Sequence, residues 1–149
     1  MEEISLRILQ QKIVINFVDN IALSSGLKSK EPFISDSFFP VVAGRYITIS
    51  TENHQSKQWD HLQEFVNLMI PILQKEDIKI IEIGANDIPL HNVISLKGAT
   101  GPNHWSYIIK NSMLHVGPES LTSHLASVRG VPQVVLFSNT SPHYAAPRW

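Results

Sequence analysis

The chain has 149 residues and a mass of 16.8 kDa, the size of one domain with a real hydrophobic core. Hydrophobic residues make up 43% and charged residues 17% of the chain, proportions that exclude disordered, collagen-like and coiled-coil proteins. Twelve basic and thirteen acidic side chains give a net charge of −1, so no overall positive field favours nucleic acid or an anionic membrane as a partner.

The chain contains no cysteine, which excludes disulfides, thiol nucleophiles and cysteine-ligated zinc and leaves the redox compartment open. It begins with the acidic sequence Met1-Glu2-Glu3, whereas a secretory signal begins with basic residues. No apolar run approaches the roughly 20 residues that a helix needs to span a bilayer. We therefore expect a soluble, cytoplasmic protein without a transmembrane segment.

The first 45 residues do not follow one secondary-structure period. Residues 4–18 mix helix and strand spacing, and residues 24–40 are rich in Ser, Gly, Pro and Lys, which is typical of a linker or a surface connection. We predict that residues 1–45 form an N-terminal connecting segment and that residues 46–149 form the folded domain.

After residue 45, short apolar runs alternate with stretches of helical period, a rhythm typical of βαβ units. The apolar runs predict buried strands over residues 46–50, 78–83, 93–96, 114–116 and 134–137. The helical stretches predict helices over residues 59–73, 104–113 and 120–128. Pro71 predicts that the first helix either kinks or ends there, and residues 142–149 predict a terminal loop. The predicted fold class is α/β, with a Rossmann-like, mainly parallel sheet flanked by helices.

Residues 116–126 place a carboxylate, several hydroxyl groups and a histidine where a predicted strand meets a predicted helix. Backbone N–H groups in the first turn of a helix have no intrahelical partner, so such a junction can bind phosphate without a basic side chain. Ligands of open α/β sheets also lie at the carboxyl ends of the strands. On pattern alone, a structural role is the more common explanation, in which Glu119 or Ser120 caps the helix and His124 packs.

The order of motifs between residues 46 and 147 resembles the C-terminal, nucleotide-sugar-binding half of GT-B glycosyltransferases of family 9, the ADP-heptose heptosyltransferase type. The matching segments are Ser56-Lys57-Gln58-Trp59, Leu96-Lys97-Gly98-Ala99-Thr100, Val116-Gly117, Glu119, His124-Leu125-Ala126, Gly130-Val131-Pro132 and Val134-Val135-Leu136-Phe137. The resemblance implies one Rossmann-like half of a GT-B fold. It also implies transfer of a sugar from a nucleoside diphosphate donor to a glycan or to a lipid-linked, lipopolysaccharide-type acceptor.

The same resemblance implies which residues contact the donor. The implied diphosphate-binding residues are Lys57, Ser120, Leu121, Thr122 and His124. Glu119 stands where the family carries an acidic residue beside the donor sugar. The implied nucleoside contacts are Asp87, Gly98 and Thr100.

Several of these positions have a second interpretation. Lys57 is alternatively a solvated lysine in the first turn of a helix, where its charge is unfavourable unless an anion is present. His124 either hydrogen-bonds the phosphates or supports the helix against the loop. Asp87 does not align in spacing with the family's ribose-binding carboxylate. Leu121 replaces a glycine that is common in the family, and its side chain would crowd the phosphates.

The family builds its active site between two Rossmann-like domains, and its catalytic base is expected on the N-terminal one. Residues 1–45 are too few to form that domain, and the family's closing C-terminal helices are missing after Trp149. We therefore expect a second domain or chain to complete the site and to supply the base. The resemblance implies inverting transfer that needs no bound metal and no other cofactor.

Other kinds of site find less support in the sequence. The chain has seven histidines, namely His54, His61, His91, His104, His115, His124 and His143. They form no HExxH or other tight ligand pair, so surface and loop histidines are expected and no metal site is predicted. No GxSxG, Walker or GxGxxG motif occurs, which argues against serine hydrolases, P-loop NTPases and ordinary dinucleotide oxidoreductases. Two alternatives to glycosyl transfer stay open: a non-catalytic nucleotide-binding or protein-interaction module of the same fold, and an enzyme like the sugar-nucleotide epimerases.

Overall fold

The computed structural model describes residues 16–41, 44–51, 59–85 and 89–149. These residues divide into two compact units, which are taken one at a time. The smaller unit comprises residues 16–30 and 140–146. The larger comprises the described residues of 31–139 together with 147–149.

The larger unit is built on a five-stranded sheet in which every pairing is parallel. Its strands are β1 (Arg45–Ser50), β2 (Ile78–Ile83), β3 (Ile94–Ser95), β4 (His115–Pro118) and β5 (Gln133–Leu136). Their order across the sheet is β3-β2-β1-β4-β5, which is the doubly wound order of a Rossmann-like fold. The predicted fold class is therefore confirmed, and all five predicted strands are present.

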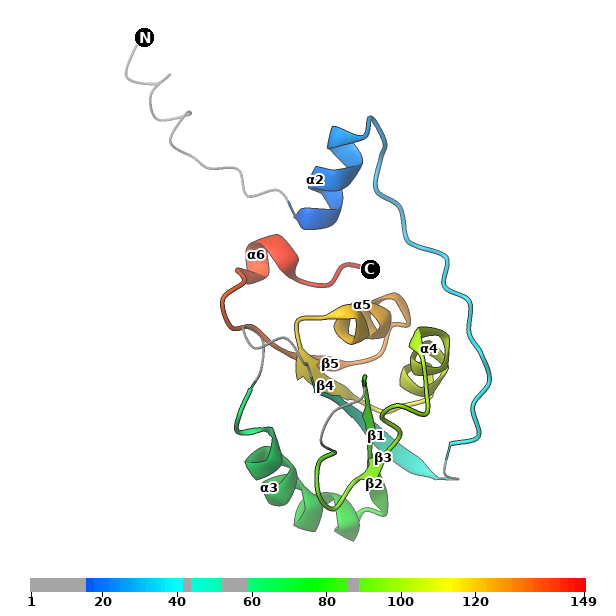
Figure 1. The fold of residues 1–149 in the computed structure, drawn as a ribbon, viewed down its shortest axis with the longest axis vertical. Helices are drawn as coiled ribbons and strands as arrows, with labels where there is room; N and C mark the ends of the chain where they lie inside the picture. Colours follow the sequence, from blue (N-terminus) through cyan, green and yellow to red (C-terminus); the bar gives the residue numbers. More distant parts are fainter. Residues whose placement is uncertain (1–15, 42–43, 52–58, 86–88) are drawn as a thin grey trace. The chain divides into compact units, whose positions relative to one another are not determined.

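Three helices cover the two faces of this sheet, namely α3 (Leu62–Lys75), α4 (Pro102–Lys110) and α5 (Leu121–Val128) (Figure 1). Because side chains of a strand point alternately to opposite faces, β1 supplies both cores. Ile47 and Ile49 join the cluster that contains Leu62 and Val66 of α3. Tyr46 joins the opposite cluster, which contains residues of α4 and α5.

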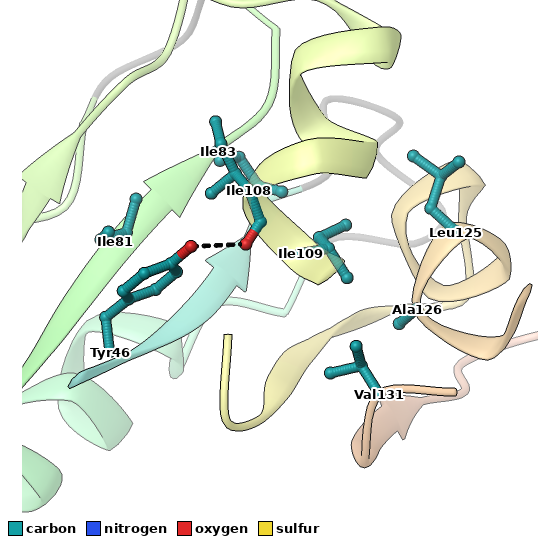
Figure 2. Packing of buried hydrophobic residues seen from close by; sticks show 8 residues of the cluster. All are labelled: Tyr46, Ile81, Ile83, Ile108, Ile109, Leu125, Ala126 and Val131. Atoms are coloured by element: carbon teal, nitrogen blue, oxygen red, sulfur yellow. Dashed lines mark hydrogen bonds between the residues drawn. The ribbon is translucent and has the colours of Figure 1, made fainter. Parts of the chain in front are cut away.

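Figure 2 shows this second cluster, in which Ile81 and Ile83 of β2 meet Ile108 and Ile109 of α4. Tyr46 lies among them and donates a hydrogen bond of 2.8 Å to the carbonyl oxygen of Ile108. Burial raises the pKa of Tyr46 to about 12, so the phenol keeps its proton and its role as donor.

The bounds of helices α3 and α4 differ from the predicted ranges. Helix α3 continues past Pro71 to Lys75, so the proline does not end it. Helix α4 begins at Pro102, earlier than predicted, because proline suits the first position of a helix, where no N–H is needed.

Residues 27–41 contain no helix or strand, as expected of a connection. Asp36 nevertheless attaches this segment to two helices of the larger unit. It accepts hydrogen bonds from Ser106 and Lys110 of α4, and it also pairs with Arg129 at the end of α5. Asp36 therefore attaches residues 31–41, which belong to the larger unit, to α4 and α5.

The smaller unit contains α2 (Phe17–Ser24) and α6 (Pro142–Ala145). The ring of Phe17 meets that of Tyr144 edge to face, with centroids 5.8 Å apart, and Asn16 donates to the carbonyl oxygen of Ala146. The prediction that residues 142–149 form a loop is wrong for the four residues of α6. Within the described part of the chain, no helix is long and apolar enough to cross a membrane.

Candidate anion-binding site at the carboxyl end of the sheet

The connections of two neighbouring strands, β1 and β4, leave the sheet toward opposite faces. The chain after β1 leads to α3, whereas the chain after β4 leads to α5, which packs on the other face (Figure 1). In open α/β sheets, this divergence leaves a crevice beyond the carboxyl ends of the two strands, where ligands bind. Residues 117–122, which we call the β4–α5 turn, lie at this point.

Gly117 allows β4 to approach β1 closely. A Cβ atom at this position would overlap Ser50 Oγ and would lie 3.3 Å from the Ser50 carbonyl oxygen. The register agrees, since Thr48 and Ile49 pair with the two residues that precede Gly117. Any side chain at position 117 would therefore separate the strands where the turn begins.

Three hydroxyl groups form a row beneath and beside the start of α5. Ser50 Oγ lies 2.8 Å from Thr122 Oγ1, and Ser120 Oγ lies 3.0 Å from the same atom. Ser50 and Thr122 are buried, whereas Ser120 is half-buried. The row, which we call the hydroxyl row (Ser50, Thr122, Ser120), therefore leads from the sheet to the helix N-terminus.

The backbone amides of the β4–α5 turn differ in whether they have a hydrogen-bond acceptor. The Glu119 amide donates to the Leu136 carbonyl oxygen, and the Ser120 amide donates to Ser123 Oγ. Leu121 and Thr122 occupy the first turn of α5, where amides have no intrahelical acceptor. The side chain of Leu121 is half exposed, at 50%. The first turn thus offers the positive end of an eight-residue helix together with one hydroxyl.

Glu119 and His124 face each other across this turn. His124 Nε2 lies 3.7 Å from Glu119 Oε1, too far for a hydrogen bond and close enough for an ion pair when the imidazole is protonated. The two side chains are 34% and 11% exposed, so the histidine faces solvent more than the carboxylate does.

The prediction that His115 is a surface or loop histidine is wrong. Its side chain is fully buried in β4, and Nδ1 lies 3.0 Å from Thr48 Oγ1 on β1. Nε2 has no hydrogen-bond partner within the described residues. Burial lowers the pKa of His115 to about 4, so the ring is neutral at pH 7. Its position in an apolar strand run was the signal available in the sequence.

A buried ion pair at the end of β2 was also missed. Glu82 is fully buried, and its Oε1 lies 3.3 Å from Lys97 Nζ, whose side chain is only 4% exposed. The Leu90 amide donates to Glu82 Oε2 at 3.1 Å. Nothing in the spacing of residues 82 and 97 indicated that they meet.

The implied nucleoside contacts are only partly described. Gly98 and Thr100 follow β3, which two strands separate from β4 in the sheet. The Thr100 hydroxyl donates to the Leu96 carbonyl oxygen and accepts from Trp105 Nε1 at 3.0 Å. Lys57 and Asp87 lie outside the described residues.

The structure therefore brings together Glu119, Ser120, Leu121, Thr122 and His124, which are close in sequence, and adds Ser50 to them. It does not bring Gly98 and Thr100 to the same turn. Among the residues that the structure describes, no three His, Asp or Glu side chains are grouped in a way that could hold a metal ion.

No family model and no curated protein sequence matches this chain. Solved structures match its fold. The heptosyltransferase TibC from enterotoxigenic E. coli is described as dodecameric and iron-containing and was solved with ADP-D-beta-D-heptose. It aligns with a TM-score of 0.58 and 20% identity over 76% of this chain and 33% of its own.

Two further solved structures match the fold of this chain. The glycosyl transferase family 9 protein from Veillonella parvula gives a TM-score of 0.58 and 16% identity, over 69% of this chain and 33% of its own. The ADP-heptose lipopolysaccharide heptosyltransferase II of E. coli gives a TM-score of 0.57 and 17% identity, over 87% of this chain and 40% of its own.

These likenesses show that the chain has an α/β fold found in family 9 glycosyltransferases, as its motifs predicted. The chain spans between 33% and 40% of the length of the three proteins.

Proposed function

We propose that this chain is the donor-binding part of a family 9-like glycosyltransferase. It would hold a nucleoside diphosphate sugar while the sugar passes to a glycan or lipopolysaccharide-type acceptor. A second domain or chain would bring the acceptor and the base that deprotonates it. The proposal includes a cytoplasmic location and a reaction that needs no bound metal.

The observation that carries this proposal is the position of the β4–α5 turn, where the connections after β1 and β4 leave toward opposite faces of the sheet. There the start of α5 presents the amides of its first turn beside the Ser120 hydroxyl, at the edge of the sheet where ligands of such folds bind. These donors suit a diphosphate, and they require no basic side chain. The fold shared with heptosyltransferases supports the same ligand class.

The turn would also contribute to the chemistry. Sugar transfer breaks the bond between the anomeric carbon and the diphosphate, and negative charge grows on the leaving oxygen. Fixed donors aimed at that charge stabilise the transition state more than the ground state. The amides of Leu121 and Thr122 and the hydroxyl of Ser120 would act in this way, with Glu119 beside the sugar.

Calorimetric titration of the chain with ADP, UDP and GDP tests the proposal. We expect one of them to bind with micromolar to millimolar affinity. Leu121→Glu places a negative charge in the first turn of α5, which stabilises the helix by about 0.3–1 kcal/mol yet repels a diphosphate. Binding should therefore weaken by roughly tenfold or more without loss of stability.

The matched control is Leu68→Glu on the exposed side of α3, which introduces the same charge at another exposed leucine and should leave binding unchanged. Lys57→Ala should weaken binding as well. If none of the three nucleotides binds, a protein-interaction module of the same fold becomes the better explanation. Breakdown of a nucleotide sugar without an acceptor would favour the epimerase-like alternative.

Transfer itself is a separate test. Turnover should require an added N-terminal domain or a second chain, because the base is proposed to lie there. Activity of that completed enzyme should persist in excess EDTA. Transfer catalysed by the 149 residues alone would contradict the two-part arrangement.

A further inference from the structure

We infer that the chain associates with a second copy of itself, by placing Phe33 of one copy in an apolar groove beside β2 of the other. The groove lies at the amino end of β2, whereas the β4–α5 turn lies at the carboxyl end of the sheet. The inference therefore goes beyond the proposed function and does not depend on it.

The first step is a groove of about 260 Å³ between α3 and the first residues of β2. Two of the residues that line it, Gln74 and Asn92, are polar and exposed. The apolar lining residues are half-buried or buried, so the interior of the groove suits an apolar side chain. They are Ile70, Leu73, Ile78, Ile80, Val93 and Ile94.

The second step is that the main chain of β2 has an open edge beside this groove. Strand β1 pairs with all of β2, from Ile78 to Ile83, whereas β3 pairs only with Ile81 and Glu82. The Glu82 carbonyl oxygen accepts from the Leu96 amide at 2.8 Å, so Glu82 faces the β3 edge, and every second residue of a strand faces the same edge. The amide and carbonyl groups of Ile78 therefore point to an edge that has no strand beside it among the described residues. Open edges of this kind bind extended segments.

The third step identifies an extended segment that fits. Phe33 is 95% exposed, more than any other large hydrophobic side chain that the structure describes. It lies within residues 27–41, which contain no helix or strand. The main chain beside it is held in place, because the Ile34 carbonyl oxygen accepts from Arg129 at 2.9 Å and Asp36 pairs with the same guanidinium. The ring is thus presented to solvent by an anchored segment, and its burial in an apolar groove would be favourable.

The geometry of the groove and that of the segment are compatible. Side chains of an extended segment project at right angles to its main-chain hydrogen bonds. Ile78 and Ile80 pack with residues of α3, so the groove lies on the α3 side of the sheet. If the Phe33 amide donates to the Ile78 carbonyl oxygen, the ring can therefore point toward α3 and into the groove. Pro32, which has no N–H, would then face away from β2, where no donor is needed.

The contact joins two different surfaces, since each copy carries one Phe33 and one groove. One aromatic side chain and a short open edge make a small interface, which belongs to the weak, transient class. We expect a dissociation constant of roughly 0.1–1 mM.

Sedimentation velocity of the full chain between roughly 10 µM and 1 mM tests the inference, and the average mass should rise with concentration. Phe33→Ser removes the ring and Ile70→Gln makes the groove polar, so each should weaken association by about tenfold or more. Two matched controls should associate like the unaltered chain. Phe38→Ser alters a ring in the same segment that is 72% exposed, and Ile72→Gln alters a residue of α3 that is 58% exposed and does not line the groove.

Mixing the two variants tests whether Phe33 and the groove meet each other. The Phe33→Ser chain keeps its groove, and the Ile70→Gln chain keeps its ring. An equimolar mixture should therefore associate at concentrations at which each variant alone is monomeric. An unaltered chain that stays monomeric up to 1 mM overturns the inference. So does a Phe33→Ser chain that associates normally, or a mixture that stays monomeric.

A peptide of residues 30–36 gives a readout that does not depend on how the Ile70→Gln chain folds. Added to the ¹⁵N-labelled Phe33→Ser chain, it should shift the amide signal of Ile78, whereas the same peptide with Phe33→Ser should not. An unmoved Ile78 signal overturns the role of the groove. Nucleotide binding by the β4–α5 turn is measured separately, so this inference and the proposed function can each fail alone.

Discussion

Two buried polar clusters border the same sheet, and their polar groups differ in whether they have partners. Beside β2, Glu82 and Lys97 are opposite charges held 3.3 Å apart, and a backbone amide adds a further hydrogen bond to the carboxylate. Between β1 and β4, His115 and the nearby hydroxyl row form a neutral cluster, and His115 Nε2 has no hydrogen-bond partner among the described residues.

This difference indicates different roles. A buried charge needs an opposite charge nearby. Removing one partner of the ionic cluster would therefore cost more stability than removing one group of the neutral cluster. Hydroxyl and imidazole groups are less costly to bury, and their protons can be redirected. Because its hydroxyl row reaches the half-buried Ser120, the neutral cluster includes the hydroxyl that we propose contacts the ligand.

The largest effect is expected from breaking the ionic cluster. Lys97→Met leaves the Glu82 carboxylate buried without its cation and should lower the free energy of unfolding by roughly 3–5 kcal/mol. Chemical denaturation followed by circular dichroism measures this loss. The double variant Lys97→Met with Glu82→Gln removes the unpaired carboxylate charge and should recover at least half of the lost stability. A loss below about 1 kcal/mol in the single variant would show that the buried Glu82 carboxylate does not depend on Lys97.

Because it contains His115, the neutral cluster should make the free energy of unfolding depend on pH. His115 has a pKa of about 4 in the folded chain against 6.5 for the ordinary side chain, so the unfolded chain binds more protons between these values. Stability should therefore be complete above pH 6.5 and fall as the pH drops toward 4, by up to about 3 kcal/mol.

His115→Phe removes this titration while keeping a ring in the core. The difference in unfolding free energy between the unaltered chain and this variant should shrink or reverse as the pH falls from 6.5 to 4. Other groups titrate in the same window in both proteins and cancel in the difference. A difference that does not change with pH would mean that the ring is protonated without cost where it lies.

Gly117 tests the close approach of β1 and β4 on which the neutral cluster depends. Gly117→Ala places a methyl group against Ser50 Oγ and the Ser50 carbonyl oxygen, and overpacking of this kind costs about 1–3 kcal/mol. Adding Ser50→Ala removes the oxygen that the methyl group meets. We expect the double variant to be less destabilised than the sum of the two single variants, as determined by thermal unfolding. Simple additivity would show that the backbone, and not the Ser50 hydroxyl, limits the approach.

The sequence predicted the parts of this molecule that depend on local patterns. The β-branched runs and helical spacing were enough to predict the five strands and the helices that cover them. Glu119 to His124 were predicted as one group because they are adjacent in sequence and lie in one turn.

The parts that were not predicted depend on pairing across the sheet. His115 meets Thr48, 67 residues away, only because of the register between β4 and β1. Glu82 and Lys97 likewise come from separate segments, and no periodicity shows which residues will lie opposite. Helix α6 was missed for a related reason: four residues give too little pattern, and the contact of Tyr144 with Phe17 joins opposite ends of the chain.

The smallest expected effect distinguishes the two interpretations of His124. The side chain is 34% exposed and 3.7 Å from Glu119, so His124→Ala should lower stability by about 0.5 kcal/mol or less. If His124 instead contacts the diphosphate, as the family resemblance implies, the same variant should bind ADP roughly threefold more weakly. Thermal unfolding and calorimetry of one sample measure both. Glu119→Gln is the control for the pair, because it removes the carboxylate charge and leaves the imidazole in place. A His124→Ala variant that loses stability but keeps its ADP affinity would assign the histidine to support of α5, and the turn would then bind its anion through amides and hydroxyls alone.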